Sequence, residues 1–151
     1  MSGIFKRIGG WFTAVLTTVA LGAGFQTQNI LARLEGVGAD VAMSDRIAMT
    51  FYDLYHFGSV YIIFVAIALT LAFLAAGLVF RLAKFGRPLI YIAAGAIALM
   101  VMLFAMKNVF FGIPFVGGAR DELGVSFQIL AGAIGGFVFT KINRPEVQSG
   151  P

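Results

Sequence analysis

The sequence predicts an all-α, polytopic membrane protein: a four-helix transmembrane bundle with a short interfacial helix in its first outer loop. Of its 151 residues, 60% are hydrophobic and 12% are charged, against roughly 45–50% and a quarter in soluble domains. The mean hydropathy is +0.93. Apolar segments of about 20 residues, the length of a membrane-spanning helix, recur four times. Four such segments leave no room for a separate soluble domain, so residues 1–144 form one four-span domain and residues 145–151 a disordered cytoplasmic tail.

The first span is expected at residues 8–30. Lys6 precedes it and Trp11 lies at its start, where an amphipathic ring suits the membrane interface. A basic start and small residues at 20–24 also fit a cleaved signal peptide. An uncleaved anchor is favoured because the helical pattern continues past those residues and stops only near Gly36.

A short helix is expected at residues 44–57, in the first outer loop. Ser44 can cap a helix start, and apolar residues follow at i, i+4, i+7 and i+8, as on one helical face. These residues are Ile47, Phe51, Leu54 and Tyr55. The aromatic residues around them favour the headgroup depth, so this helix is predicted to lie at the interface.

The remaining spans are expected at residues 60–80, 88–106 and 121–139. The connection between the first two is short and contains Gly86, so these spans should form an antiparallel hairpin. Residues 109–119 are apolar but interrupted by glycine and proline, and are too short to cross a membrane. They are expected to form a packed loop or a re-entrant segment.

Lysine and arginine are distributed unequally between the two sides of this topology. Seven lie on the side of both termini and of the 81–87 turn, and four on the other side, which carries six acidic residues. Because cytoplasmic loops are enriched in Lys and Arg, both termini are predicted to be cytoplasmic, in a protein of the cell inner membrane. The same rule explains the net charge of +4 without a nucleic-acid partner.

The chemistry available to the chain is limited. It contains no cysteine and one histidine, His56, so no metal site and no cofactor is expected. No catalytic motif is present. Asp53 and His56 are the weak candidates for catalysis, because residues three apart share a helical face and a carboxylate beside an imidazole can perform acid–base chemistry.

Small residues recur at helical spacing in three of the spans. Gly132 and Gly136 form a Gly-x-x-x-Gly pattern in the fourth, Ala94 and Ala98 lie in the third, and three alanines lie at 68, 72 and 76 in the second. Such residues let helix backbones approach closely. Two interpretations remain open: packing within the bundle, or a homodimer contact along the fourth span.

Polar residues concentrate at the non-cytoplasmic ends of the spans. Because polar groups in a membrane normally find partners, we expect a polar pocket open to that side. Its candidate residues are Gln26, Gln28, Asn29, Asp53, His56, Lys107, Asn108, Asp121 and Gln128. Within it, Lys107 is expected to contact Asp53, Asp121 or Glu122, because pairing lowers the cost of burying a charge.

Three functions are compatible with these features. The first is a packing, assembly or accessory role in the membrane, with the lipid bilayer and either a homo-oligomer or a larger membrane complex as partners. The alternative is a transporter or binding protein that takes a small or lipid-like molecule into the outer pocket. The third is a membrane enzyme acting on lipid or quinone through Asp53 and His56.

Overall fold

The structure is a computed structural model that describes residues 2–84, 86–109, 116, 119 and 121–143. The described residues form four α-helices: α1 (Ser2–Gly36), α2 (Met43–Ala83), α3 (Arg87–Val109) and α4 (Glu122–Ile142). Each is long and apolar enough to cross a membrane, as the hydropathy predicts. The tail at 145–151 and most of the 109–119 segment lie outside the described residues.

The helix ends follow from backbone conformation. After α1 the chain turns at Gly38, whose φ of +92° suits a residue without a Cβ. After α2, Lys84 adopts the left-handed conformation and its N–H donates to the carbonyl of Phe80, which satisfies one free carbonyl at the helix end. Only residues 84–86 separate α2 from α3, so the two helices must meet at this turn.

The expectation of a separate helix at residues 44–57 is wrong. This segment is helical, but it forms the first part of α2, which runs unbroken for 41 residues, or about 61 Å at 1.5 Å per residue. Neither Gly58 nor Ser59 interrupts the helix, because a glycine costs only about 1 kcal/mol there while a proline would cost about 3. A methyl group on Gly58 would lie 3.6 Å from Val19 of α1.

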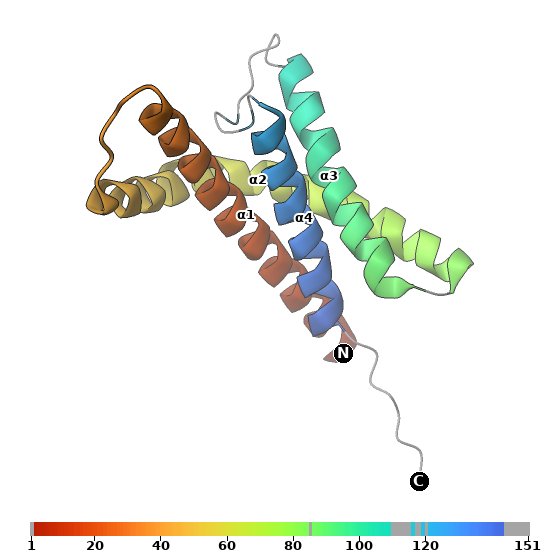
Figure 1. Cartoon of the computed structure of the whole chain (residues 1–151). Coiled ribbons are helices and arrows are strands. Elements are labelled where there is room, and N and C mark those ends of the chain that lie inside the picture. Colours follow the sequence, from red (N-terminus) through yellow and green to blue (C-terminus); the bar gives the residue numbers. More distant parts are fainter. Residues whose placement is uncertain (1, 85, 110–115, 117–118, 120, 144–151) are drawn as a thin grey trace.

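The helices pack in a ring in which each packs mainly against two neighbours: α1 against α2 and α4, and α3 against α2 and α4. Figure 1 shows α1, α4 and α3 side by side, with α2 crossing behind them at a steep angle and its first turns extending past α1. The centre of the core is formed by large buried side chains from all four helices and from the segment before α4. They include Val15, Tyr61, Val65, Leu69, Leu99, Val116 and Phe139.

The closest helix contact joins α3 and α4. A methyl group on Gly95 would clash with the carbonyl group of Gly132, and one on Gly136 would lie 2.7 Å from the carbonyl carbon of Tyr91. On the neighbouring face of α4, a methyl group on Gly135 would meet Thr18 of α1. The Gly-x-x-x-Gly pattern of α4 is therefore used for packing within the bundle, where α3 occupies the face that a homodimer would need.

Candidate functional site

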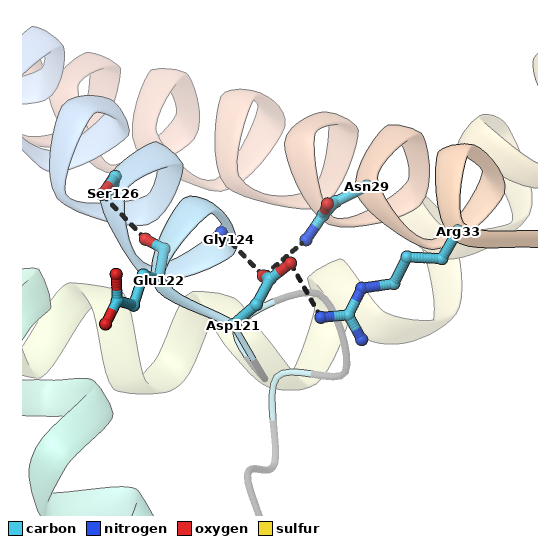
Figure 2. A network of polar contacts seen from close by, with 6 residues as sticks. All are labelled: Asn29, Arg33, Asp121, Glu122, Gly124 and Ser126. Carbon is cyan, nitrogen blue, oxygen red and sulfur yellow. Dashed lines mark hydrogen bonds and ion pairs between the residues drawn. The ribbon is translucent and has the colours of Figure 1, made fainter. Parts of the chain in front are cut away.

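The first polar contact of the predicted pocket joins the end of α1 to the start of α4. Asp121 caps α4: its Oδ1 accepts hydrogen bonds from the backbone N–H of Gly124, at 2.9 Å, and from Nδ2 of Asn29, at 3.0 Å. Its Oδ2 pairs with the Arg33 guanidinium at 2.8 Å. Figure 2 shows Asn29 and Arg33 reaching Asp121 from successive turns of α1, while Glu122 points away.

These contacts favour the charged form of Asp121. The hydrogen bond from Arg33, then those from the Gly124 backbone and Asn29, lower the pKa of the Asp121 carboxyl to about 2. Asp121 is therefore a carboxylate over the whole physiological pH range. Its two oxygens accept bonds that position two helix ends, so its chemistry here is structural.

A second polar contact lies in the middle of the bundle. The side chain of Gln128 is 1% exposed. Its Oε1 accepts a hydrogen bond of 2.6 Å from the Tyr61 hydroxyl of α2, and its Nε2 donates one of 2.9 Å to the Gly22 carbonyl of α1. One amide thus joins α4 to both α1 and α2.

The absence of a side chain at Gly22 makes room for this contact. A methyl group there would lie 2.8 Å from Oε1 of Gln128 and 2.9 Å from a ring carbon of Tyr61. Buried amides and hydroxyls are stable only when they are hydrogen-bonded, and here three helices contribute to one satisfied network.

A third group of contacts joins α1 to the first turns of α2. Thr27 donates a hydrogen bond of 2.8 Å to Oδ2 of Asp53. Gln28 donates to Thr50 and accepts from Arg46, which also pairs with the carboxylate of Glu35. These contacts hold α2 against α1 beyond the point where the bundle ends. An open hollow of about 340 Å³ lies beside them, lined by Gln28, Met43, Arg46, Ile47, Thr50 and Phe51.

Two predicted site residues at the end of α3 do not join the others. Lys107 is exposed, and no ion pair links it to Asp53, Asp121 or Glu122 among the described residues. The predicted Lys107 contact is therefore wrong, because Arg33 occupies the Asp121 carboxylate instead. Asn108 is also exposed and donates to the Phe104 carbonyl of its own helix.

The Asp53–His56 pair is not assembled. Asp53 accepts from Thr27, whereas His56 is exposed, with Nδ1 3.1 Å from the Tyr52 carbonyl oxygen. The His56 ring stacks on Tyr52 at 4.0 Å between centroids and meets Tyr55 edge-on. No hydrogen bond joins the carboxylate to the imidazole in the described part of the chain, so nothing orients these groups for proton transfer.

Gln26, another candidate residue of the predicted pocket, is buried, with 6% of the residue exposed. Its Oε1 receives no hydrogen bond from any described residue. It differs in this from Gln128, which is also buried but whose side-chain oxygen and nitrogen each have a hydrogen-bond partner. Among the described residues no cluster of three metal-ligating side chains exists.

The sequence missed the partners that satisfy these groups. The aromatic residues that follow position 50 predict an interfacial place for Tyr61 as well, but Tyr61 is the buried donor to Gln128. In the sequence, Arg33 is one of the four basic residues on the non-cytoplasmic side, and the structure shows that it pairs with Asp121. The helical spacing of Asn29 and Arg33 is a signal that could have identified the Asp121 contact. The two residues are one turn apart and so lie on one face of α1.

A larger hollow lies between α2 and α3, and all the residues that line it are apolar. The two helices diverge from their shared turn and leave a groove of about 470 Å³. Alanines contribute to both walls: Ala68 and Ala72 from α2, and Ala98 and Ala105 from α3. The other lining residues are Phe64, Ile67, Leu71, Ile97, Val101, Met102, Met106 and Val109.

Comparison with known proteins gives no assignment: no protein-family model matches this chain, and no curated protein or solved structure matches it.

Proposed function

We propose that this chain is an integral membrane protein that acts by packing, as an accessory or assembly subunit of a larger membrane complex. The observation that carries this proposal is that candidate pocket residues form hydrogen bonds between helices. Asn29, Asp53, Asp121 and Gln128 each bond to a residue of another helix. Polar side chains that bond to other helices stabilise the bundle. Few of the candidate polar groups then remain free to bind a substrate.

The α2/α3 groove supplies a surface for such a role. In lipid, helices associate through close packing of small residues rather than through the hydrophobic effect. A transmembrane helix of a partner, laid along the groove, would insert its larger apolar side chains between the alanines of α2 and α3. Such an insertion would extend the ring of helices without disturbing the contacts that α4 makes.

The proposed orientation follows from charge. Both termini and the 84–86 turn lie in the cytoplasm, and the polar contacts around Asp121 lie on the non-cytoplasmic side of the inner membrane. The first part of α2, residues 43–57, lies in the interface on that side. Its exposed Met43, Ile47, Phe51 and Tyr55 fit the boundary between headgroups and acyl chains.

Reporter fusions test this topology. A reporter joined after Lys84 should be cytoplasmic and one joined after Gly118 should be non-cytoplasmic. The same sidedness for both fusions contradicts the four-span arrangement.

Purification from native membranes tests the assembly role. Two exposed alanines of α3 form a matched pair: Ala105 lines the groove, and Ala93 lies on the same helix away from it. Tagged wild-type protein and the Ala93→Trp variant should retain a partner at constant stoichiometry. The Ala105→Trp variant should lose it, because the indole fills the groove.

The other outcomes separate the remaining functions. A chain that purifies as a monomer without any protein partner, before and after Ala105→Trp, contradicts the assembly role. A lipid retained by wild type and Ala93→Trp, and released by Ala105→Trp, instead favours binding of a lipid-like molecule. That ligand would occupy the apolar groove and not the polar pocket that the sequence predicts.

A further inference from the structure

The amide oxygen of Gln26 is the one buried side-chain polar atom, among the residues that the structure describes, that has no hydrogen-bond partner. No described residue donates a hydrogen bond to its Oε1. A buried amide oxygen left without a donor costs about 1–3 kcal/mol, and nearly all such groups in folded proteins bond to protein or to ordered water. The oxygen therefore calls for a donor that is small enough to enter the core.

The register between α1 and α4 places Gln26 opposite a glycine. Gly22 contacts Gln128, and Asn29 contacts Asp121. The two helices are therefore antiparallel, and a step of seven residues forward along α1 matches a step of seven residues backward along α4. Gln26, four residues after Gly22, thus lies level with Gly124, four residues before Gln128. Gly124 is buried and has no side chain that could fill the space beside Gln26.

The amide of Gln128 lies beside this position. Its Nε2 donates to the carbonyl of Gly22, the same carbonyl that accepts the backbone N–H of Gln26 in a regular α-helix. Nε2 carries two hydrogens, and one of them remains after the bond to Gly22. Because side chains in a helix lean back towards the preceding turn, we expect the Gln26 amide to extend towards Gly22 and thus towards this free hydrogen.

We infer that Gln26 and Gln128 hold one water molecule in the core of the bundle, between α1 and α4. The water accepts from Nε2 of Gln128 and donates to Oε1 of Gln26. Two polar partners are the fewest that an internal water normally has. The site thereby adds a second, water-mediated bond to the network that joins α1, α2 and α4.

Nuclear magnetic resonance of the full chain in chain-deuterated detergent micelles tests this site directly. The side-chain amide of Gln128 should show cross-relaxation with a long-lived water, and this signal should vanish in Gln26→Leu. Thr18→Val is the matched control, because Thr18 is also buried at the α1/α4 contact but donates to the Ala14 and Ala131 carbonyls and to neither glutamine. The control variant should keep the signal.

Stability gives a second, independent readout. An apolar residue of similar size in place of an unbonded polar group is neutral or stabilising. With the water in place, Gln26→Leu instead removes a bonded acceptor and leaves a water with a single partner. The ratio of folded to unfolded protein should then fall about tenfold, which corresponds to about 1.4 kcal/mol.

Each readout can overturn the inference alone. An unchanged or higher folded ratio in Gln26→Leu means that no donor is bound at Oε1. Absence of the water signal at Gln128 in the wild-type chain means the same, whatever the variant does to stability. Both outcomes leave the proposed assembly role intact, because that role depends on the α2/α3 groove.

Discussion

The two faces of α3 use small residues to opposite effect. Towards α4, Gly95 contacts Gly132 so closely that neither backbone has room for a methyl group. Towards α2, Ala98 and Ala105 face Ala68 and Ala72 across an open groove of about 470 Å³. Small residues permit close approach of two helices. Their backbones come into contact only if both helices carry small residues at the same level and no larger side chains hold the helices apart.

Aromatic rings explain why the second contact stays open. Phe73 of α2, Tyr91 of α3 and Phe139 of α4 form a cluster with centroids 4.5–5.5 Å apart. This cluster fills the space between the three helices near the turn at residues 84–86. From there α2 crosses behind α3 at a steep angle (Figure 1), and the alanines further along the two helices line an open groove.

The strongest test of this contrast is a larger side chain at the closed contact. Gly132→Leu should destabilise the protein by about 3 kcal/mol or more, because backbone atoms, unlike side chains, cannot move aside. Unfolding in mixed micelles, followed by the fluorescence of the single tryptophan Trp11, measures the loss. Trp11 donates to Thr70 of α2 and so reports separation of α1 from α2.

A folded, fully stable Gly132→Leu variant would show that α3 and α4 are not in backbone contact. The homodimer interpretation of the Gly-x-x-x-Gly pattern would then be open again. Measurement at several protein concentrations distinguishes these cases, since only a dimer gains stability with concentration.

The next largest effect is expected at the polar centre of the bundle. Gln128→Leu removes the acceptor for the buried Tyr61 hydroxyl and should cost about 1–2 kcal/mol. Tyr61→Phe removes the donor from the same bond. If the bond is formed, the two losses are not additive, and a double-mutant cycle gives a coupling energy above about 0.5 kcal/mol. Additive losses would contradict the contact.

A smaller, pH-dependent effect is expected at Asp121. Its pKa of about 2 in the folded protein lies below the value of about 3.9 for an unfolded chain. Its charge therefore stabilises the folded state above about pH 4, and this contribution is lost as the pH falls towards 2. Because the side chain is partly exposed, solvent weakens the pairing with Arg33.

Asp121→Asn isolates this contribution, because asparagine also caps helices but carries no charge. Thermal unfolding of wild type and variant should differ most at neutral pH and converge between about pH 4 and pH 2. A difference that stays constant over this range would show that Asp121 acts only as a helix cap.

The sequence predicts the architecture well because hydropathy and helix ends are local properties. Four apolar segments, the turn at Gly86 and the stop near Gly36 need no knowledge of partners. The prediction of a separate helix at 44–57 is wrong because polar residues do not by themselves end a helix: α2 continues through Asp53, which contacts Thr27 of α1.

Pairing in the candidate site was harder to predict because it depends on helix register. The sequence places Asp121, Lys107 and Arg33 near the same side of the membrane. Lys107 is closer to Asp121 along the chain than Arg33 is, which favours Lys107 as the partner. The structure brings Arg33 to Asp121 because α1 and α4 are neighbours, which no local pattern reveals. The same holds for the small residues: whether they form a close contact or line a groove depends on which helices are neighbours and on their register.

The smallest effect is expected in the groove. Ala105→Leu introduces the same residue as Gly132→Leu. Ala105 lies on α3, which takes part in both the closed and the open contact, but its side chain points into the open groove. The free energy of unfolding should change by less than about 0.5 kcal/mol, as for substitutions that break no contact. A loss comparable to that of Gly132→Leu would mean that α2 closes on α3 in the membrane. The groove would then be unable to accept a partner, and the proposed assembly surface would have to lie elsewhere. A neutral Ala105→Leu that still loses the co-purifying partner would separate folding from association at one residue, which is the result that the assembly role requires.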